Sequence, residues 1–326
     1  MRRVGRVIAI AGVLTVACSS GNAPQPPEPT PAPSGPQLSG VYTARIGNFI
    51  TDNNQELPDG AGAFDLVIRS VCTDDGCVAT ATAPNAHRAS ALQAERAAAE
   101  LVLDYVDGQW IAVETWTGEC TPADGSGRLQ TANWDSFILD PQPDGTLVGE
   151  YTGRGALETC AGSTRQRLTM TRTGDVDPDY PLPDPALLPP RKASAASGFH
   201  GMYEYTSVNV TPNVPAGTPG GAKLTYTATT VCLRTGDRCL TYLLTKEGYS
   251  RALTFADGKW TEQSAPFPGA CAPSGTATKV RRGEFTLPPS PSDPIAEVQG
   301  MVSEQALDGP CKGTSEFTNT LRHITD

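Results

Sequence analysis

The cysteines are the residues of this sequence whose spacing implies chemistry most directly. The chain of 326 residues has nine cysteines, and eight of them form two sets of four with matched spacing. In both sets the last two cysteines are forty residues apart. Even numbers of cysteines at repeated spacings are typical of disulfide bonds formed outside the reducing cytoplasm.

A zinc site is the competing interpretation, and the spacing disfavours it. Zinc ligands usually come in pairs about two to four residues apart, often with histidines nearby. The close cysteine pairs here are five and seven residues apart, and the chain has only three histidines. Four cysteines allow three pairings, and we favour the one that joins the close pairs across hairpin turns. The expected disulfides are Cys72–Cys77, Cys120–Cys160, Cys232–Cys239 and Cys271–Cys311.

Signatures of catalysis are otherwise missing from the sequence. It has no Gly-x-Ser-x-Gly elbow, no Gly-rich phosphate loop and no His and Asp cluster at metal-ligand spacing. Neither cysteine set has the Cys-x-x-Cys spacing of a redox-active pair. We therefore predict a protein that is not an enzyme, with no catalytic residue, no cofactor and no metal. A hydrolase assembled from distant carboxylates is the weaker alternative.

The cysteines lie in a longer repeated frame. Each copy has an Asp-Gly-x-Trp motif, at 107–110 and at 257–260, and a cysteine follows ten or eleven residues later. Both copies also have a glycine eleven residues before the last cysteine, Gly149 and Gly300. Self-similarity of this kind indicates two domains of one type in tandem.

The Asp-Gly dipeptides predict how each domain builds its core. Asp-Gly between apolar runs is a strong signal for a two-residue β-hairpin loop. Such a loop places Tyr105 opposite Trp110, and Phe255 opposite Trp260. Side chains alternate between the two faces of a strand, so one face of each hairpin is apolar. The expected core residues are Leu103, Tyr105, Trp110, Leu253, Phe255 and Trp260.

Composition favours an all-β fold. Only 18% of the residues are charged, and the 33 glycines and 29 prolines suit short strands joined by turns. Strand-like segments number about eight in each copy, which is a common size for a closed antiparallel barrel. We expect two tandem β-barrel-like domains, with a β-sandwich as the alternative. The formal net charge of −10 argues against nucleic-acid partners.

The first residues are typical of an export signal. Residues 1–18 contain three arginines, then an apolar run, and end in Leu-Thr-Val-Ala-Cys, which resembles a lipoprotein cleavage site with Cys18 as the lipidated residue. An ordinary cleaved signal peptide is the alternative. The remaining organisation is a Pro-rich tether at 19–37, β domain 1 at 38–175, a Pro-rich linker at 176–198 and β domain 2 at 199–326.

Each domain opens with Gly-x-Tyr and has an arginine in its expected last strand. The tyrosines are Tyr42 and Tyr203, and the arginines are Arg172 and Arg322. This arrangement resembles the closure of lipocalin-like (calycin) barrels, in which a first-strand Trp packs under a last-strand Arg. Here Tyr replaces Trp. The resemblance implies that each arginine covers one end of its barrel through a cation–π contact.

Several further segments resemble a group of mycobacterial envelope lipoproteins. They are the leader, the Pro-rich tether, Cys77–Thr82, the Asp-Gly-x-Trp hairpin, Pro143–Leu147 and Thr171–Asp175. Similar modules occur as extracytoplasmic parts of membrane Ser/Thr kinases. The resemblance implies export and sensing, and it brings no active site.

These expectations combine into one functional hypothesis. We expect an envelope lipoprotein anchored by Cys18 to the outer face of the cell membrane. It would act as a non-enzymatic binding or sensing module for an apolar or cell-wall ligand, or for a partner protein of the envelope. A purely structural envelope protein is the first alternative, and a hydrolase acting on envelope material is the second.

Overall fold

The computed structural model describes most of the chain after residue 36. The described ranges are 37–58, 60–74, 76–83, 101–120, 127–155, 162–212, 223–271 and 274–324. The segment Ser34–Asp326 forms one compact unit. Cys18 and Cys160 lie outside the described residues. None of the helices in the described ranges has the length and hydrophobicity that a membrane span requires.

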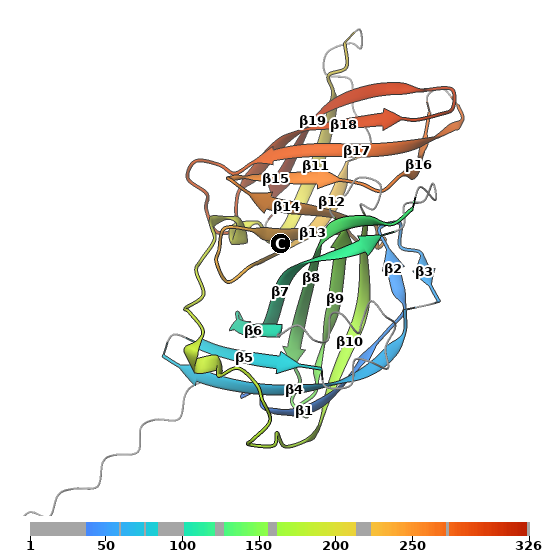
Figure 1. The fold of residues 1–326 in the computed structure, drawn as a ribbon. Coiled ribbons are helices and arrows are strands. Elements are labelled where there is room, and N and C mark those ends of the chain that lie inside the picture. Colours follow the sequence, from blue (N-terminus) through green and yellow to red (C-terminus); the bar gives the residue numbers. More distant parts are fainter. Residues whose placement is uncertain are drawn as a thin grey trace, which may run out of the picture. The chain divides into compact units, whose positions relative to one another are not determined.

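The first half of the unit is a closed barrel of eight antiparallel strands (Figure 1). Neighbours in sequence pair in succession, and β10 closes the barrel by pairing with β1. A small hairpin of β2 (Phe49–Thr51) and β3 (Glu56–Leu57) extends the sheet beside β10. The barrel strands are β1 (Gly40–Ile46), β4 (Gly62–Thr73), β5 (Gly76–Thr82), β6 (Leu101–Val106), β7 (Gln109–Cys120), β8 (Leu129–Pro141), β9 (Leu147–Gly155) and β10 (Gly162–Gly174).

The second half repeats this plan. Its barrel closes through the pairing of β11 with β19 and of β15 with β17, and β16 (Phe267–Ala270) pairs beside β15 on β17. The closed pairing confirms the predicted all-β fold of two tandem barrels and excludes the sandwich. The barrel strands are β11 (Gly201–Asn209), β12 (Leu224–Cys232), β13 (Cys239–Thr245), β14 (Ser250–Ala256), β15 (Lys259–Gln263), β17 (Thr276–Thr286), β18 (Glu297–Ala306) and β19 (Gly313–His323).

The connection between the two halves has little regular structure. Two short 3-10 helices occur in it, η3 (Pro185–Leu187) and η4 (Ala195–Gly198). The side chain of Asp184 caps η3, and that of Ser194 caps η4. The connection is held to the first barrel by the Thr80 hydroxyl, which donates to the carbonyl of Pro183 at 2.7 Å.

The two Asp-Gly hairpins fix the register of both cores. Asp107 and Asp257 both have φ of 51°, and the glycines that follow also have positive φ. Two successive left-handed residues form the turn whose twist matches a two-residue β-hairpin. The turn pairs Tyr105 with Trp110, and its counterpart pairs Phe255 with Trp260. The two tryptophan side chains are 1% and 0% exposed.

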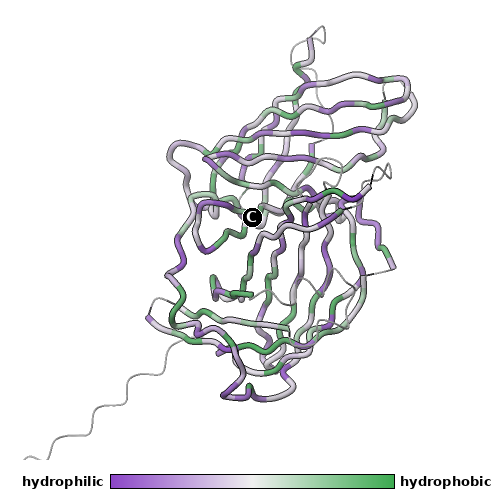
Figure 2. Tube along the Cα trace, viewed as in Figure 1, coloured by the Kyte–Doolittle hydropathy of each residue, from purple (hydrophilic) through white to green (hydrophobic). Residues whose placement is uncertain are grey.

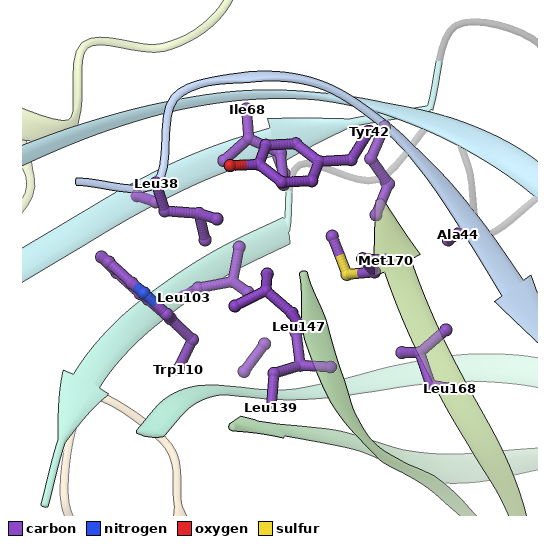
Figure 3. Close-up of a cluster of buried hydrophobic side chains, with 14 of the residues drawn as sticks. Leu38, Tyr42, Ala44, Ile68, Leu103, Trp110, Leu139, Leu147, Leu168 and Met170 are labelled. Carbon is purple, nitrogen blue, oxygen red and sulfur yellow. The ribbon is translucent and has the colours of Figure 1, made fainter. Parts of the chain in front are cut away.

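Each barrel interior contains a cluster of buried apolar side chains. In the first barrel, Figure 3 shows Trp110, Leu103 and Leu139 pointing into the same space as Tyr42 and Met170. In the second, Trp260 packs edge-on against Phe199, with ring centroids 5.1 Å apart. Hydrophobic and hydrophilic residues are interleaved along the strands of both barrels (Figure 2), as expected when one face of a strand is buried.

Disulfides link strands within each barrel. Three of the expected pairs are present in the described residues: Cys72–Cys77, Cys232–Cys239 and Cys271–Cys311. Cys120 is also disulfide-bonded, and its expected partner Cys160 lies outside the described residues. The two short-range pairs join residues that lie directly opposite each other on adjacent antiparallel strands.

The predicted closure pairs differ between the barrels. Tyr42 lies opposite Arg172, whose Nε donates to the carbonyl of Ser39 at 3.1 Å. In the second barrel the register instead places His323 opposite Tyr203, and the two rings pack edge to face with centroids 5.2 Å apart.

Arg322 is therefore not the closure residue that the sequence predicted. It lies opposite Glu204, on the outer face of the barrel, and its guanidinium pairs with Glu297 at 2.8 Å. Successive side chains of a strand point to opposite faces, so Arg322 points outward and His323 takes the position beside Tyr203.

Candidate functional site

The contact surface between the two barrels is the candidate functional site, since packed side chains fill both barrel interiors. An apolar cluster forms one part of this surface. Trp134 on β8 is 6% exposed and packs with Leu240 and Tyr242 from β13 of the other barrel. The other members are Val231 and Ala252, with Ile111, Val113, Ile138 and Leu233 packed against them. Arg238 lies over the Trp134 ring, 5.7 Å from its centroid.

Asp52 forms the centre of the polar part of the surface. It lies in the turn between β2 and β3 and accepts hydrogen bonds from the backbone N–H of Ser163 at 3.0 Å and from the Ser163 hydroxyl. It also accepts from the Ser250 hydroxyl at 3.0 Å, while its own carbonyl accepts from the Ser250 N–H at 2.9 Å. The hydroxyls of Tyr242 and Ser250 lie 3.2 Å apart. Three separate parts of the chain therefore meet at one carboxylate.

Burial changes the acidity of this group. Desolvation raises the pKa of Asp52 above its ordinary 3.8, although the hydrogen bonds from Ser163 and Ser250 and the charge of Arg154 act in the opposite direction. The pKa of Tyr242 rises to about 12, mainly because the ring is buried and also because of the Asp52 charge. Tyr242 is thus a neutral hydrogen-bonding group at physiological pH.

Replacing Asp52 by asparagine is expected to remove a pH dependence of stability. The folded-state pKa is raised, so the unfolded chain loses its proton first as the pH rises above 3.8. The free energy of unfolding therefore falls between that pH and the raised pKa, and stays low above it. Asp52→Asn keeps a neutral side chain that can still accept from Ser163, so the fall should disappear.

Melting temperatures of the two proteins, measured from acid to neutral pH, check this expectation. The variant should gain relative to the parent as the pH rises. Asp144→Asn is the matched control, because hydrogen bonds from Thr146 lower the pKa of that exposed carboxyl, so its effect has the opposite sign. Parallel curves for Asp52→Asn and the parent would contradict the assignment.

Arginines from the first barrel extend the contact. Arg154 on β9 is 6% exposed, and its Nη2 donates to the carbonyl of Gln263 at 3.0 Å. Its Nε is buried and has no hydrogen-bond partner among the described residues. Burial lowers the pKa of Arg154, against the charges of Asp52 and Glu262. Arg165 donates to the carbonyl of Gly248 at 3.2 Å.

At another place on the surface, Asp104 on β6 pairs with Arg234 of the second half and lies 3.8 Å from Arg191. Burial raises the pKa of Asp104, and the charges of both arginines oppose the rise. The contact between the barrels therefore combines an apolar cluster with buried charged groups.

A cleft of about 90 Å³ lies between the outer faces of β8 and β9 and those of β12 and β13. Its lining has five hydroxyl side chains, one carboxylate and four aliphatic side chains. The lining residues are Ser136, Ile138, Glu150, Thr152, Thr227, Thr229, Val231, Leu240, Tyr242 and Leu244. No group of three or more His, Cys, Asp and Glu residues in the described ranges could hold a metal ion.

The second barrel contains a buried ion pair in its interior. The Arg251 and Glu262 side chains are 6% and 3% exposed, and Arg251 Nε donates to Glu262 Oε1 at 2.8 Å. Burial alone would raise the pKa of Glu262, but the charge and hydrogen bonds of Arg251, with Arg281 and Arg154, hold it below its usual value. The Arg251 guanidinium also lies over the Tyr205 ring, 5.0 Å from its centroid.

The first barrel has apolar residues at the equivalent positions. Arg251 lies two residues before Leu253, and Leu101 lies two residues before Leu103. Glu262 lies two residues after Trp260, and Ala112 lies two residues after Trp110. Two barrels of the same type thus fold, one with this charged pair and one without it.

The residues that meet at the contact surface were not among those predicted from the sequence. Asp52, Ser163 and Ser250 come from separate turns or strand ends, and no local pattern marks them. The predicted core residues lie away from the surface: Leu103, Trp110, Leu253, Phe255 and Trp260 belong to the two interior clusters, and Tyr105 packs against the first.

Residues 35–187 match the family described as the PknI serine/threonine-protein kinase sensor domain. The match spans the first barrel and continues to the end of η3. Over 127 residues the chain is 32% identical to the serine/threonine-protein kinase PknI of Mycobacterium tuberculosis and to that of Mycobacterium bovis. This alignment covers 37% of the chain and 21% of the kinase, so the chain spans about a fifth of the length of these relatives.

Two solved structures of the M. tuberculosis PknI sensor domain, a monomer form and a dimer form, also resemble the chain. Both are 23% identical and are covered to 99%; they cover 47% and 56% of the chain, with TM-scores of 0.36 and 0.30. The family match and the kinase relatives confirm the predicted resemblance to extracytoplasmic modules of membrane Ser/Thr kinases.

Proposed function

We propose that the chain is an extracytoplasmic sensing module without catalytic activity, anchored to the outer face of the membrane. The observation that carries this proposal is the match of residues 35–187 to a kinase sensor domain. The buried carboxylates support it, because Asp52 and Asp104 are held by hydrogen bonds or ion pairs that link the two barrels. Groups with shifted pKa values can be structural as well as catalytic.

The interior of the barrels favours one kind of binding over another. An apolar ligand inside a barrel, as considered from the sequence, would need to displace buried side chains such as Trp110 or Trp260. Recognition on the outer faces requires no such displacement. A partner protein of the envelope or a ligand held between the barrels is therefore the favoured occupant.

Lipid anchoring is tested by changing the expected acceptor. Cys18→Ser should move the chain, expressed at full length in a mycobacterial host, from the detergent phase to the aqueous phase on phase separation, because no acyl chains are attached. Ser19→Ala is the matched control and should stay in the detergent phase. Unchanged partition of Cys18→Ser would contradict the anchor.

Sensing is tested by binding. A ligand that binds only the folded chain raises its melting temperature in proportion to the logarithm of ligand concentration. Fractionated envelope extract should contain a component that raises the melting temperature of the mature chain. If no fraction does so and no envelope protein crosslinks to the chain in cells, the purely structural alternative is favoured.

A further inference from the structure

Five of the ten residues that line the cleft between the barrels have a hydroxyl group. Ser136 and Thr152 come from the first barrel, and Thr227, Thr229 and Tyr242 come from the second. A hydroxyl group both donates and accepts hydrogen bonds, so it can bond to the hydroxyl groups of a ligand that carries no charge. Ser136, Thr152 and Tyr242 are buried and form the deep part of the cleft, whereas Thr227 and Thr229 are exposed and stand at its rim.

The charge of the cleft is nearly balanced. Glu150 is the one carboxylate in the lining, and its Oε2 lies 3.6 Å from Nη1 of Arg165. Burial raises the pKa of Glu150, and the charges of Arg165 and Arg167 act against the rise. Tyr242 stays neutral. A ligand with a net charge would therefore have no unpaired counter-charge in this lining, which favours a neutral one.

The aliphatic part of the lining and the volume limit the ligand further. Ile138, Val231, Leu240 and Leu244 offer surfaces that suit C–H groups rather than polar ones. The cleft has a volume of only about 90 Å³. Only the edge of a larger molecule fits, and that edge must carry both hydroxyl and C–H groups.

We propose that the cleft binds the edge of a neutral polyhydroxylated molecule, a sugar or polyol, through hydroxyls contributed by both barrels. This inference rests on the proposed sensing function and names the ligand class for it. Because both barrels contribute to the lining, a bound ligand makes all its contacts only when the two barrels are packed against each other. Binding therefore favours the packed arrangement of the barrels, and a shift of this kind is how a sensor responds to its ligand.

Ligand-observed saturation-transfer NMR on the mature chain tests the proposal, with glycerol, D-glucose and maltotriose as probes. A site this small implies millimolar affinity. Thr227→Val with Thr229→Val removes two hydroxyls but keeps the shape and strand propensity of exposed residues, so the fold should persist. The double variant should weaken binding about tenfold, since each hydrogen bond contributes modestly.

Thr225→Val is the matched control, because Thr225 lies on the same face of β12 outside the cleft. It should bind as the parent does. Binding of glycerol and D-glucose would assign a free polyol, and binding of maltotriose alone would assign a glycan chain. Both outcomes support the inference.

Two results would overturn it: no saturable signal from any of the three probes, or equal binding by the parent and the double valine variant. These failures are separable from failure of the proposed function. Loss of polyol binding with intact detergent-phase partition and a stabilising envelope fraction would leave the sensing module in place with a different ligand. Absence of any stabilising fraction, together with absence of any crosslinked envelope protein, would contradict the proposed function itself.

Discussion

Glu262→Ala is expected to lower the free energy of unfolding by about 3–5 kcal/mol, because removing one partner of a buried ion pair strands the other. Arg251 would keep its charge in the barrel interior, with the Tyr205 and Tyr226 rings beside its guanidinium but no carboxylate bonded to it. Arg251→Leu should cost less, since Arg281 Nη1 remains 3.8 Å from Glu262. Chemical denaturation of the mature chain measures both.

The double variant Arg251→Leu with Glu262→Ala should be more stable than the Glu262→Ala single variant. It installs the residues that the first barrel has at these positions, Leu101 and Ala112, and it removes both desolvated charges together. The two changes contact each other, so their effects should be strongly non-additive. If the losses simply add, the pair is not coupled and the equivalence of the two barrels at these positions is wrong.

The second barrel contains the Arg251–Glu262 ion pair, and the first barrel does not. Buried ion pairs are often no more stabilising than apolar residues of similar size, and the first barrel is an example within the same chain. Stability alone therefore does not account for Arg251 and Glu262. Glu262 also faces the charge of Arg154, which comes from the first barrel. The pair thus adds an electrostatic link between the barrels that an apolar core could not supply.

Local patterns predicted the two Asp-Gly hairpins and the two close cysteine pairs. Asp-Gly turns require two left-handed residues, and both dipeptides adopt them. Cysteines on facing strands are held within disulfide distance by the ladder itself, as for Cys72 and Cys77. These features depend only on neighbours in sequence or in one hairpin, so the sequence contains enough information to specify them.

The buried ion pair could have been predicted from the same reasoning. Alternation puts Arg251 on the face of Leu253, and Glu262 on the face of Trp260, and Leu253 lies opposite Glu262 in the hairpin. The next inward-facing position on each strand, two residues further along, holds Arg251 on one strand and Glu262 on the other. They were missed because charged residues are rarely buried unless they are paired.

The remaining features depend on information that no local pattern contains. Whether Arg322 or His323 lies beside Tyr203 depends on the register of β11 against β19. These two strands are more than one hundred residues apart in sequence. The bonds of Asp52 to Ser163 and Ser250 span 111 and 198 residues. Contacts of this kind depend on how distant segments pack within one barrel or between the two, so turn chemistry and periodicity could not specify them.

Removal of the Cys271–Cys311 disulfide is expected to cost about 4 kcal/mol, against about 2 kcal/mol for Cys232–Cys239, when each pair is replaced by alanines and unfolding is followed in denaturant. The difference follows from the closed loops, which span 40 and 7 residues, because a longer loop loses more unfolded-state entropy when it is closed. The shorter loop is the matched control, since both pairs lie in one barrel. If its removal costs as much as that of the longer loop, then packing rather than loop closure governs, because Cys239 is fully buried. That result would make the close pairs a part of the core and the long-range pair a link between the turn after β16 and the turn before β19.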